Sequence, residues 1–181
     1  MGWGFSLELT KPDRGWRACS PNAHTKDDRP PTFDEVRALN RPFEDGLMKL
    51  NPNLKFFMVD HTALAQANNV PIEDARRRHM NSELNDLEVG VKVSLYGTCS
   101  IVTIPYLRDG ADMQRSWRRA WEYVELLARM GGFVVIDSSS GNVLDPERDH
   151  HVPIREYLKR AKRIYGTLSG TRSLANGSAT L

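Results

Sequence analysis

The stretch MQRSWRRAWEYVELLARMGGFVVIDSSSGNVLDP, residues 113–146, decides the fold that we predict for this chain. Apolar side chains recur in its first half at three- and four-residue spacing, which predicts an amphipathic helix over residues 113–130. A Gly-Gly pair then ends the helix. The strand predicted at 133–137 begins with an apolar run, which is typical of a strand covered on both faces. A Ser-Gly-Asn turn follows, and residues 143–144 can pair back on that strand.

The same helix mixes arginines with aromatic residues, a pattern that can bind RNA. Trp117 and Trp121 follow the apolar stripe, so we expect both to lie in the core. Tyr123 falls outside the stripe, and we expect it to be less buried. Arg115 and Arg118 lie mainly on the opposite side. The pattern therefore indicates packing rather than a nucleic-acid surface.

Further elements are predicted on both sides of this unit. Residues 91–105 alternate between apolar and polar and contain a Gly turn, which predicts a β-hairpin with one buried face. Thr32 and Glu35 form a capping-box pattern that starts a helix over 33–50. Residues 3–9 suit an edge or half-buried strand, and 54–59 form a short apolar run that suits another strand. On the helix we expect the inward residues to be Phe33, Val36, Leu39, Phe43, Leu47 and Leu50.

These elements predict one α+β domain over residues 1–166, followed by a flexible polar tail over 167–181. Its antiparallel or mixed sheet contains the central hairpin 91–105 and strand 133–137. Helices at 33–50, 113–130 and 153–165 pack on the sheet.

The composition of the chain is that of a soluble globular protein. The 181 residues are 40% hydrophobic and 27% charged, with a net charge of +2, so no global field attracts nucleic acid or an anionic membrane. No apolar run is long enough to span a membrane, and the N-terminus lacks the pattern of a secretory signal. Two cysteines, Cys19 and Cys99, are too few for a disulfide framework. We therefore expect a cytoplasmic protein without membrane partners.

Residues 62–84 resemble the helix-turn-helix of bacterial DNA-binding proteins. Asn69 takes the turn between two helices, and the second helix, 71–84, becomes the recognition helix. The hairpin 91–105 then serves as the wing of a winged-helix domain. DNA binding in this arrangement depends on three arginines, Arg76, Arg77 and Arg78. Two carboxylates in the first turn of the recognition helix oppose it, so a plain helical hairpin is the favoured interpretation.

The acidic, histidine and serine residues show no spacing typical of a catalytic site. Asp149, His150 and His151 are weak candidates for a metal site, but their spacing imposes no ligand geometry. Asp137 precedes three serines, and an ordinary turn explains this pattern better than a nucleophile elbow. We therefore predict no metal, no cofactor and no catalytic residue.

The helix predicted at 153–165 is amphipathic and basic. Its cationic residues lie opposite an apolar stripe, which suits an acidic protein surface, although a solvated outer face has the same pattern. The cationic residues are Arg155, Lys159, Arg160, Lys162 and Arg163.

A family resemblance is carried by AWEYVELLARMGGFVVIDSSSGNVLD, residues 120–145. It resembles the ending of many small uncharacterised bacterial α+β proteins, some of which are immunity proteins of polymorphic toxins. Many of those have an Asp-Pro-Gln-x-Gly turn after the strand, where this chain has Asp137-Ser-Ser-Ser-Gly141. The resemblance covers about residues 90–146 and implies a fold and a protein partner, but no catalytic residue. Our leading hypothesis is a non-enzymatic protein-binding module of immunity type, and the alternative is winged-helix-like DNA binding through 62–84.

Overall fold

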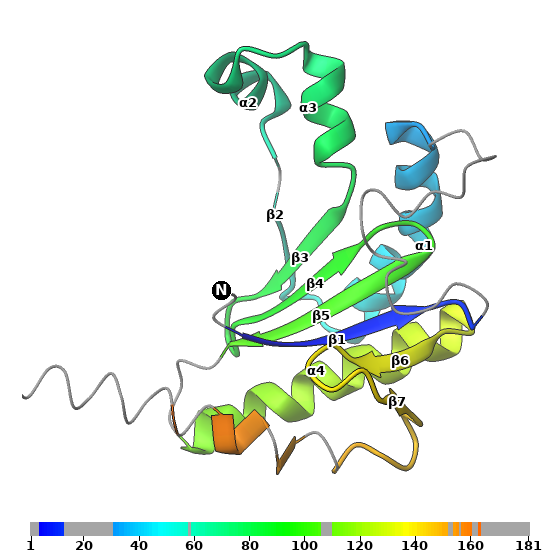
Figure 1. Ribbon diagram of the computed structural model, residues 1–181, viewed down its shortest axis with the longest axis vertical. Helices are drawn as coiled ribbons and strands as arrows, with labels where there is room; N and C mark the ends of the chain where they lie inside the picture. The colour runs from blue at the N-terminus through cyan, green and yellow to red at the C-terminus, as the bar shows by residue number, and fades with distance from the viewer. Residues whose placement is uncertain are drawn as a thin grey trace, which may run out of the picture.

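Seven strands form one antiparallel sheet with the order β2-β3-β4-β5-β1-β6-β7 (Figure 1). The computed structural model describes residues 4–12, 31–57, 59–105, 110–151, 154–155, 157–160 and 163. The strands are β1 (Gly4–Thr10), β2 (Lys55–Phe57), β3 (Ser82–Asp86), β4 (Val91–Leu95), β5 (Cys99–Pro105), β6 (Val134–Asp137) and β7 (Val143–Leu144). The helices are α1 (Phe33–Leu50), α2 (His61–Asn68), α3 (Ile72–Arg78) and α4 (Gly110–Gly131). Among the described helices, none combines the length and apolarity needed to cross a membrane.

The predicted fold class is confirmed. Every strand pair is antiparallel, and the hairpin β4–β5 occupies the middle of the sheet, flanked by β3 and β1. Strand β6 also forms where residues 133–137 predicted it, and β7 pairs back on it. The tail 167–181 lies outside the described residues.

The N-terminal strand is an interior strand, so our prediction of an edge or half-buried strand is wrong. β1 pairs with β5 on one side and with β6 on the other. Leu7 and Leu9 are fully buried on one face, and Thr10 is fully buried on the other. The alternation of residues 3–9 indicates that the two faces of the strand differ in polarity, but it cannot show how many strands pair with it.

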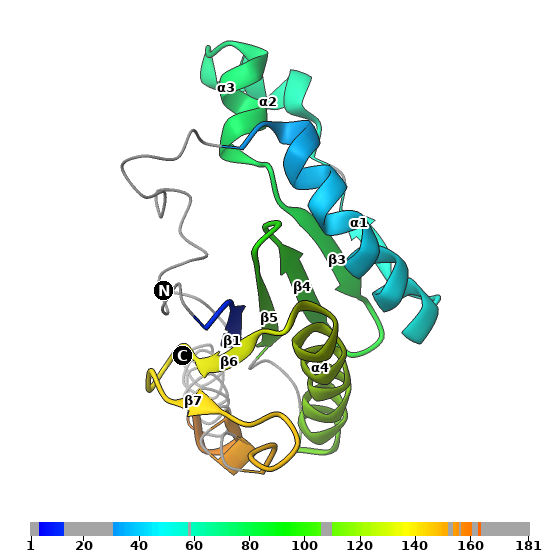
Figure 2. The same ribbon diagram turned by 90° about the vertical axis from the view of Figure 1, so that its right-hand side faces the viewer.

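Helices α1 and α4 lie on one face of the sheet and contact each other (Figure 2). The apolar stripe of α4 packs into the core as predicted, except that Tyr123 is fully buried. Our placement of Tyr123 outside the stripe is wrong. Its position, three residues after Ala120 and four before Leu127, is helical stripe spacing, and both of those neighbours are fully buried.

Helix α1 begins at the predicted capping box, in which Thr32 and Glu35 bond each other's backbone N–H, and it runs through Pro42 without a break. Two predicted inward residues are wrong: Leu39 is 48% exposed and Leu50 is 41% exposed. Polar residues take their place. Asn40 and Glu44 are buried on the same stripe as Val36 and Leu47 because hydrogen bonds satisfy them there.

Two buried polar groups tie the helices to the sheet. The Asn40 side chain donates to the Ser82 hydroxyl and the Leu95 carbonyl, each at 3.0 Å, and accepts from the Gly97 N–H at 2.7 Å. Gly97 has a positive φ of 82°, and a Cβ there would lie 3.2 Å from a Leu39 methyl group, so this tight turn favours glycine. A second group links Asn51, Asp86 and Tyr123. These contacts fix α1 and α4 at defined positions over β3, β4 and the turns beside them.

The Asp86 carboxylate is the centre of that second group. It accepts from the Tyr123 hydroxyl at 2.6 Å and from the Asn51 amide at 3.0 Å. Its other oxygen accepts from the backbone N–H groups of Glu88 and Val89 in the β3–β4 turn. Burial, assisted by the adjacent Asp86 carboxylate, raises the pKa of Tyr123 well above its ordinary value.

Candidate functional site

A pocket of about 550 Å³ lies between α4 and the loop that follows β7. The α4 residues at this pocket share one face of the helix, and the other wall comes from the loop and from the start of segment 154–163. The lining residues are Gln114, Trp117, Arg118, Trp121, Glu122, Glu125, His150, His151 and Ile154. The pocket therefore joins two features that the sequence places apart, the arginine–tryptophan helix and the histidine loop.

Two stacked tryptophans hold the loop on α4. The rings of Trp117 and Trp121 are 5.6 Å apart, with 22° between their planes. Each indole N–H donates to a loop carbonyl, Trp117 to His150 at 3.2 Å and Trp121 to Pro146 at 2.9 Å. Both tryptophans are almost fully buried and form the floor of the pocket. The prediction that these tryptophans belong to the core is confirmed.

The charges around the pocket are mixed. Arg118 and Glu125 are exposed, and within the described part of the chain neither forms an ion pair. Glu122 accepts from Arg119 at 2.8 Å, so its charge is compensated locally. A free cation and a free anion at the rim thus flank an aromatic floor, an arrangement suited to anchoring one side chain of a partner.

The weak metal candidates lie beside this pocket. The rings of His150 and His151 are 5.4 Å apart in an edge arrangement, and both residues are exposed. Asp149 is engaged elsewhere, because its carboxylate accepts from the Asp145 N–H at 2.9 Å. Over the described ranges, no group of three or more His, Cys, Asp or Glu side chains is arranged to hold a metal ion.

The basic segment 154–163 is anchored by Tyr157. This side chain is fully buried, packs 5.5 Å from the Trp117 ring and 6.0 Å from the Phe5 ring, and donates to the Pro105 carbonyl at 2.8 Å. Ile154 and Leu158 also pack against the core, as the predicted apolar stripe requires. In Figure 1 the orange segment accordingly runs beside the first half of α4.

The cationic residues of this segment lie on the other side. Arg155, Lys159 and Arg163 are exposed, and Arg160 is partly exposed. Lys159 and Arg163 have further partners in the molecule, whereas Arg155 and Arg160 form no ion pair among the residues that the structure describes. The fifth predicted residue, Lys162, lies outside the described residues. The described members of this set follow Ile154, which lines the pocket, along the same segment.

The helix-turn-helix-like segment forms only in part. α2 and α3 do form a hairpin with Asn69 in the left-handed conformation, at φ 50°. The predicted recognition helix 71–84 is wrong, because α3 ends at Arg78 and residues 82–86 form β3. Ser82, Leu84 and Asp86 are buried while the residues between them are partly exposed, and this two-residue period is that of a strand.

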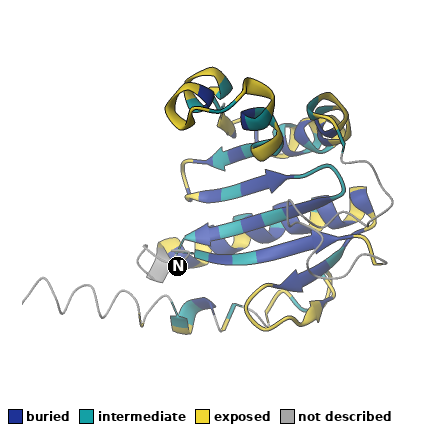
Figure 3. Ribbon diagram, turned by 45° about the horizontal axis from the view of Figure 1, so that its top comes forward, coloured by how far each residue is buried: buried dark blue, intermediate teal, exposed yellow. Residues whose placement is uncertain are grey.

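The winged arrangement is also wrong, because the hairpin 91–105 lies in the centre of the sheet. The α2–α3 hairpin instead projects beyond the ends of β2 and β3 (Figure 1), and most of its residues are exposed (Figure 3). Arg76 pairs with Glu73 at 2.8 Å, and Arg77 pairs with Asp74 at 3.4 Å. Of the three predicted DNA-binding arginines, Arg78 alone lacks such a pair within the described part of the chain. DNA binding through α3 stays a prediction. The ion pairs of Arg76 and Arg77 reduce the positive charge that α3 offers to DNA phosphates.

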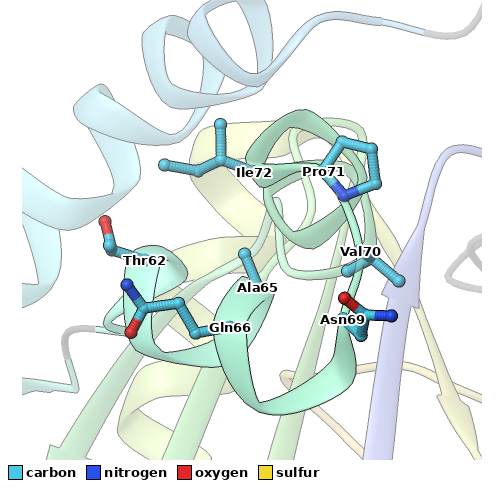
Figure 4. Close-up of a pocket in the computed structure, with 7 residues that line it drawn as sticks. All are labelled: Thr62, Ala65, Gln66, Asn69, Val70, Pro71 and Ile72. Carbon is cyan, nitrogen blue, oxygen red and sulfur yellow. The ribbon is translucent and has the colours of Figure 1, made fainter.

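A hollow of about 480 Å³ lies between α2 and α3 (Figure 4). It is lined by Thr62, Ala65, Gln66, Asn69, Val70, Pro71 and Ile72. Ala65 is nearly buried where the two helices cross, and the turn residue Val70 donates its N–H to the Ala65 carbonyl. This side of the hairpin presents uncharged groups and offers no chemistry that selects a ligand.

Asp137, the other acidic candidate, is engaged in its own turn, as predicted. One carboxylate oxygen accepts from the Ser139 N–H at 2.8 Å and from the Ser139 hydroxyl at 2.5 Å, and the other accepts from the Ser140 hydroxyl at 2.8 Å. The Asp137 carbonyl accepts from the Gly141 N–H at 2.7 Å. Asp137 as a whole is 5% exposed, and its carboxylate stabilises the β6–β7 connection.

No protein-family model matches this chain, and no curated protein or solved structure is significantly similar to it. The resemblance to immunity proteins therefore stays a prediction based on residues 90–146.

Proposed function

We propose that this chain is a non-enzymatic module that binds another protein through segment 154–163 and the pocket beside it. The observation that carries the proposal is that the apolar side of this segment packs against the core. Tyr157 packs against the Trp117 ring and donates a hydrogen bond to the Pro105 carbonyl. These contacts fix the backbone that carries the basic side chains. A preorganised surface loses less conformational entropy on binding than a mobile one does.

The charges favour an acidic partner. Within the described ranges, Arg155 and Arg160 on the segment and Arg118 at the pocket rim have no ion pair that would compete with a carboxylate of the partner. Complementary charges accelerate association and select among partners, although exposed pairs add little to affinity. The neighbouring pocket can add affinity, because its aromatic floor can bury one apolar or aromatic side chain of the partner.

The partner that we propose in particular is a cognate toxin, which the chain neutralises in the cytoplasm as an immunity-type protein. The resemblance over residues 90–146 supports this assignment. An acidic surface on the toxin is what the basic segment requires. The role of Asp137 in its turn agrees with a module that carries out no reaction.

A photocrosslinking experiment tests the proposal. A benzophenone amino acid replaces Arg155, and a control variant carries it at Leu87, which is 70% exposed in the β3–β4 turn. Irradiation of the intact chain in its native cells should join the 155 variant, but not the 87 variant, to an acidic segment of one protein. Identical adducts at both positions, or adducts to nucleic acid, would contradict the proposal.

A further inference from the structure

The outer edge of β2 is a second surface that can accept another chain. β2 is the terminal strand of the sheet, and within the described ranges its partner is β3 alone. Phe56 is 39% exposed and Phe57 is 57% exposed, although most phenylalanines of a folded protein are buried. The unpaired backbone of an edge strand is a ready template for one more strand.

The register with β3 shows which face each side chain occupies. Phe56 lies opposite Leu84, which is fully buried, so Phe56 belongs to the face covered by α1 and α4. Lys55 and Phe57 alternate with it and lie on the other face, opposite Asn85 and Glu83. The edge therefore carries an exposed aromatic ring on each face of the sheet, and Lys55 shares its face with Phe57.

We propose that two copies of this chain pair antiparallel along β2, with Phe56 opposite the second copy's Phe56. In this register Lys55 of each copy lies opposite Phe57 of the other, on the same face of the joined sheet. An ammonium group beside an aromatic ring is attractive, and two aromatic side chains opposite each other stabilise a strand pair. No like charges meet in this register. Among the residues that the structure describes, Lys55 forms no ion pair that would compete with the contact to Phe57.

This self-complementarity favours a second copy over an unrelated strand. β2 contains both Lys55 and Phe57, so two copies related by a two-fold axis form the Lys–Phe contact twice. The opposite edge offers less: β7 has two residues, of which Val143 is 66% exposed and Leu144 is buried. The pairing of β2 is independent of the proposed partner site, because β3, β4 and β5 separate β2 from β1, whose Phe5 contacts Tyr157.

Sedimentation velocity on the full chain over a wide concentration range tests the pairing. The wild type should show a reversible monomer–dimer equilibrium. Phe57→Asp should weaken dimerisation at least about tenfold, because it removes a ring that the dimer would bury and places a carboxylate in the joined sheet. Val143→Asp makes the same type of change at the other edge and should dimerise like the wild type. Phe57→Tyr, which keeps the ring, should also dimerise, and circular dichroism checks that each variant folds.

Crosslinking tests the register. Residues directly opposite in an antiparallel pair have Cα atoms about 4.5–5.5 Å apart, within the range of about 4.4–6.8 Å that a disulfide spans. In a Cys19→Ser background, Phe56→Cys should therefore form an interchain disulfide on mild oxidation. Lys55→Cys should not, because it lies opposite Phe57.

Four results would overturn the proposal. They are a wild type that stays monomeric at the highest concentration, a Phe57→Asp variant that dimerises normally, a disulfide at position 55 but not at 56, and a monomer that uses Phe57 to bind a different protein.

Discussion

Replacing Tyr123 by phenylalanine should destabilise this protein more than the loss of one oxygen atom suggests. The ring itself keeps its packing, because phenylalanine fills the same volume in the core. The change removes a hydroxyl that is fully buried and joins α4 to the β3–β4 turn and to the end of α1. The effect on stability therefore reports on hydrogen bonding alone.

The magnitude follows from two contacts. The hydroxyl donates to the Asp86 carboxylate at 2.6 Å, and a hydrogen bond to a charged group contributes about 1.5–3 kcal/mol. It also accepts from the Asn51 amide at 2.7 Å, a neutral contact worth about 0.5–1.5 kcal/mol, part of which Asn51 regains by keeping its bond to Asp86. We expect a loss of about 2–3 kcal/mol in the free energy of unfolding. For a chain of this size that lowers the Tm by about 4–12 °C.

Urea unfolding followed by tryptophan fluorescence measures this loss. Asp86→Asn and the double variant complete a thermodynamic cycle, in which the coupling between Tyr123 and Asp86 should be about 1–3 kcal/mol. The pH dependence adds a second test. Because burial raises the pKa of Tyr123 in the folded state, the contribution of the phenol is complete below its unfolded pKa of about 10 and is lost at higher pH. The difference between wild type and Tyr123→Phe should therefore shrink as the pH rises above about 10.

Two results would refute this reasoning. A destabilisation below about 0.5 kcal/mol would be that of an ordinary surface change and would mean that the buried hydroxyl contributes nothing. A difference between the two proteins that stays constant into strongly alkaline solution would show that the phenol ionises as readily in the folded state as in the unfolded chain.

Three further substitutions test other parts of the structure. Asn40→Ala should cost about 2–4 kcal/mol in urea unfolding, because the buried Leu95 carbonyl, the Ser82 hydroxyl and the Gly97 N–H each lose a hydrogen bond. Trp121→Ala should cost about 3–5 kcal/mol and release the loop that it holds, so trypsin should cut faster after Arg148, and an unchanged cleavage rate would contradict this role. Asp137→Ala should cost about 1.5–3 kcal/mol in thermal unfolding by removing the acceptor of the β6–β7 turn, whereas a neutral result would show that the turn forms without it.

Periodicity was sufficient to predict the layers of this fold. The alternation in 91–105 and the stripe in 113–130 identified the central hairpin and the helix that packs on it, because burial of one face imposes those periods. Periodicity failed where a polar residue occupies the buried stripe. Asn40 and Tyr123 both have stripe spacing, yet their partners Leu95 and Asp86 lie 55 and 37 residues away in the sequence.

The candidate site was predictable by residue type but not by arrangement. The sequence singled out the histidine loop, the tryptophans of α4 and the basic helix separately, since nothing local indicates that one pocket contains parts of all three. The indole N–H bonds that join them run to backbone carbonyls, which every residue possesses. The exposed phenylalanines of β2 were missed for a related reason, because an apolar run at 54–59 predicts a strand but not its place at the sheet edge.

The most direct test of the central claim compares two double charge reversals in a binding titration. The ligand is the protein crosslinked at position 155, and the variants are Arg155→Glu/Arg160→Glu and, as a control with the same change in charge, Arg77→Glu/Arg78→Glu on α3. We predict that the first variant binds at least about tenfold more weakly, a loss of about 1.4 kcal/mol, with a wild-type affinity that falls as salt is added. The α3 variant should bind like the wild type. Equal affinity of the first variant and the wild type, or loss of binding in the α3 variant alone, would contradict a partner site on segment 154–163.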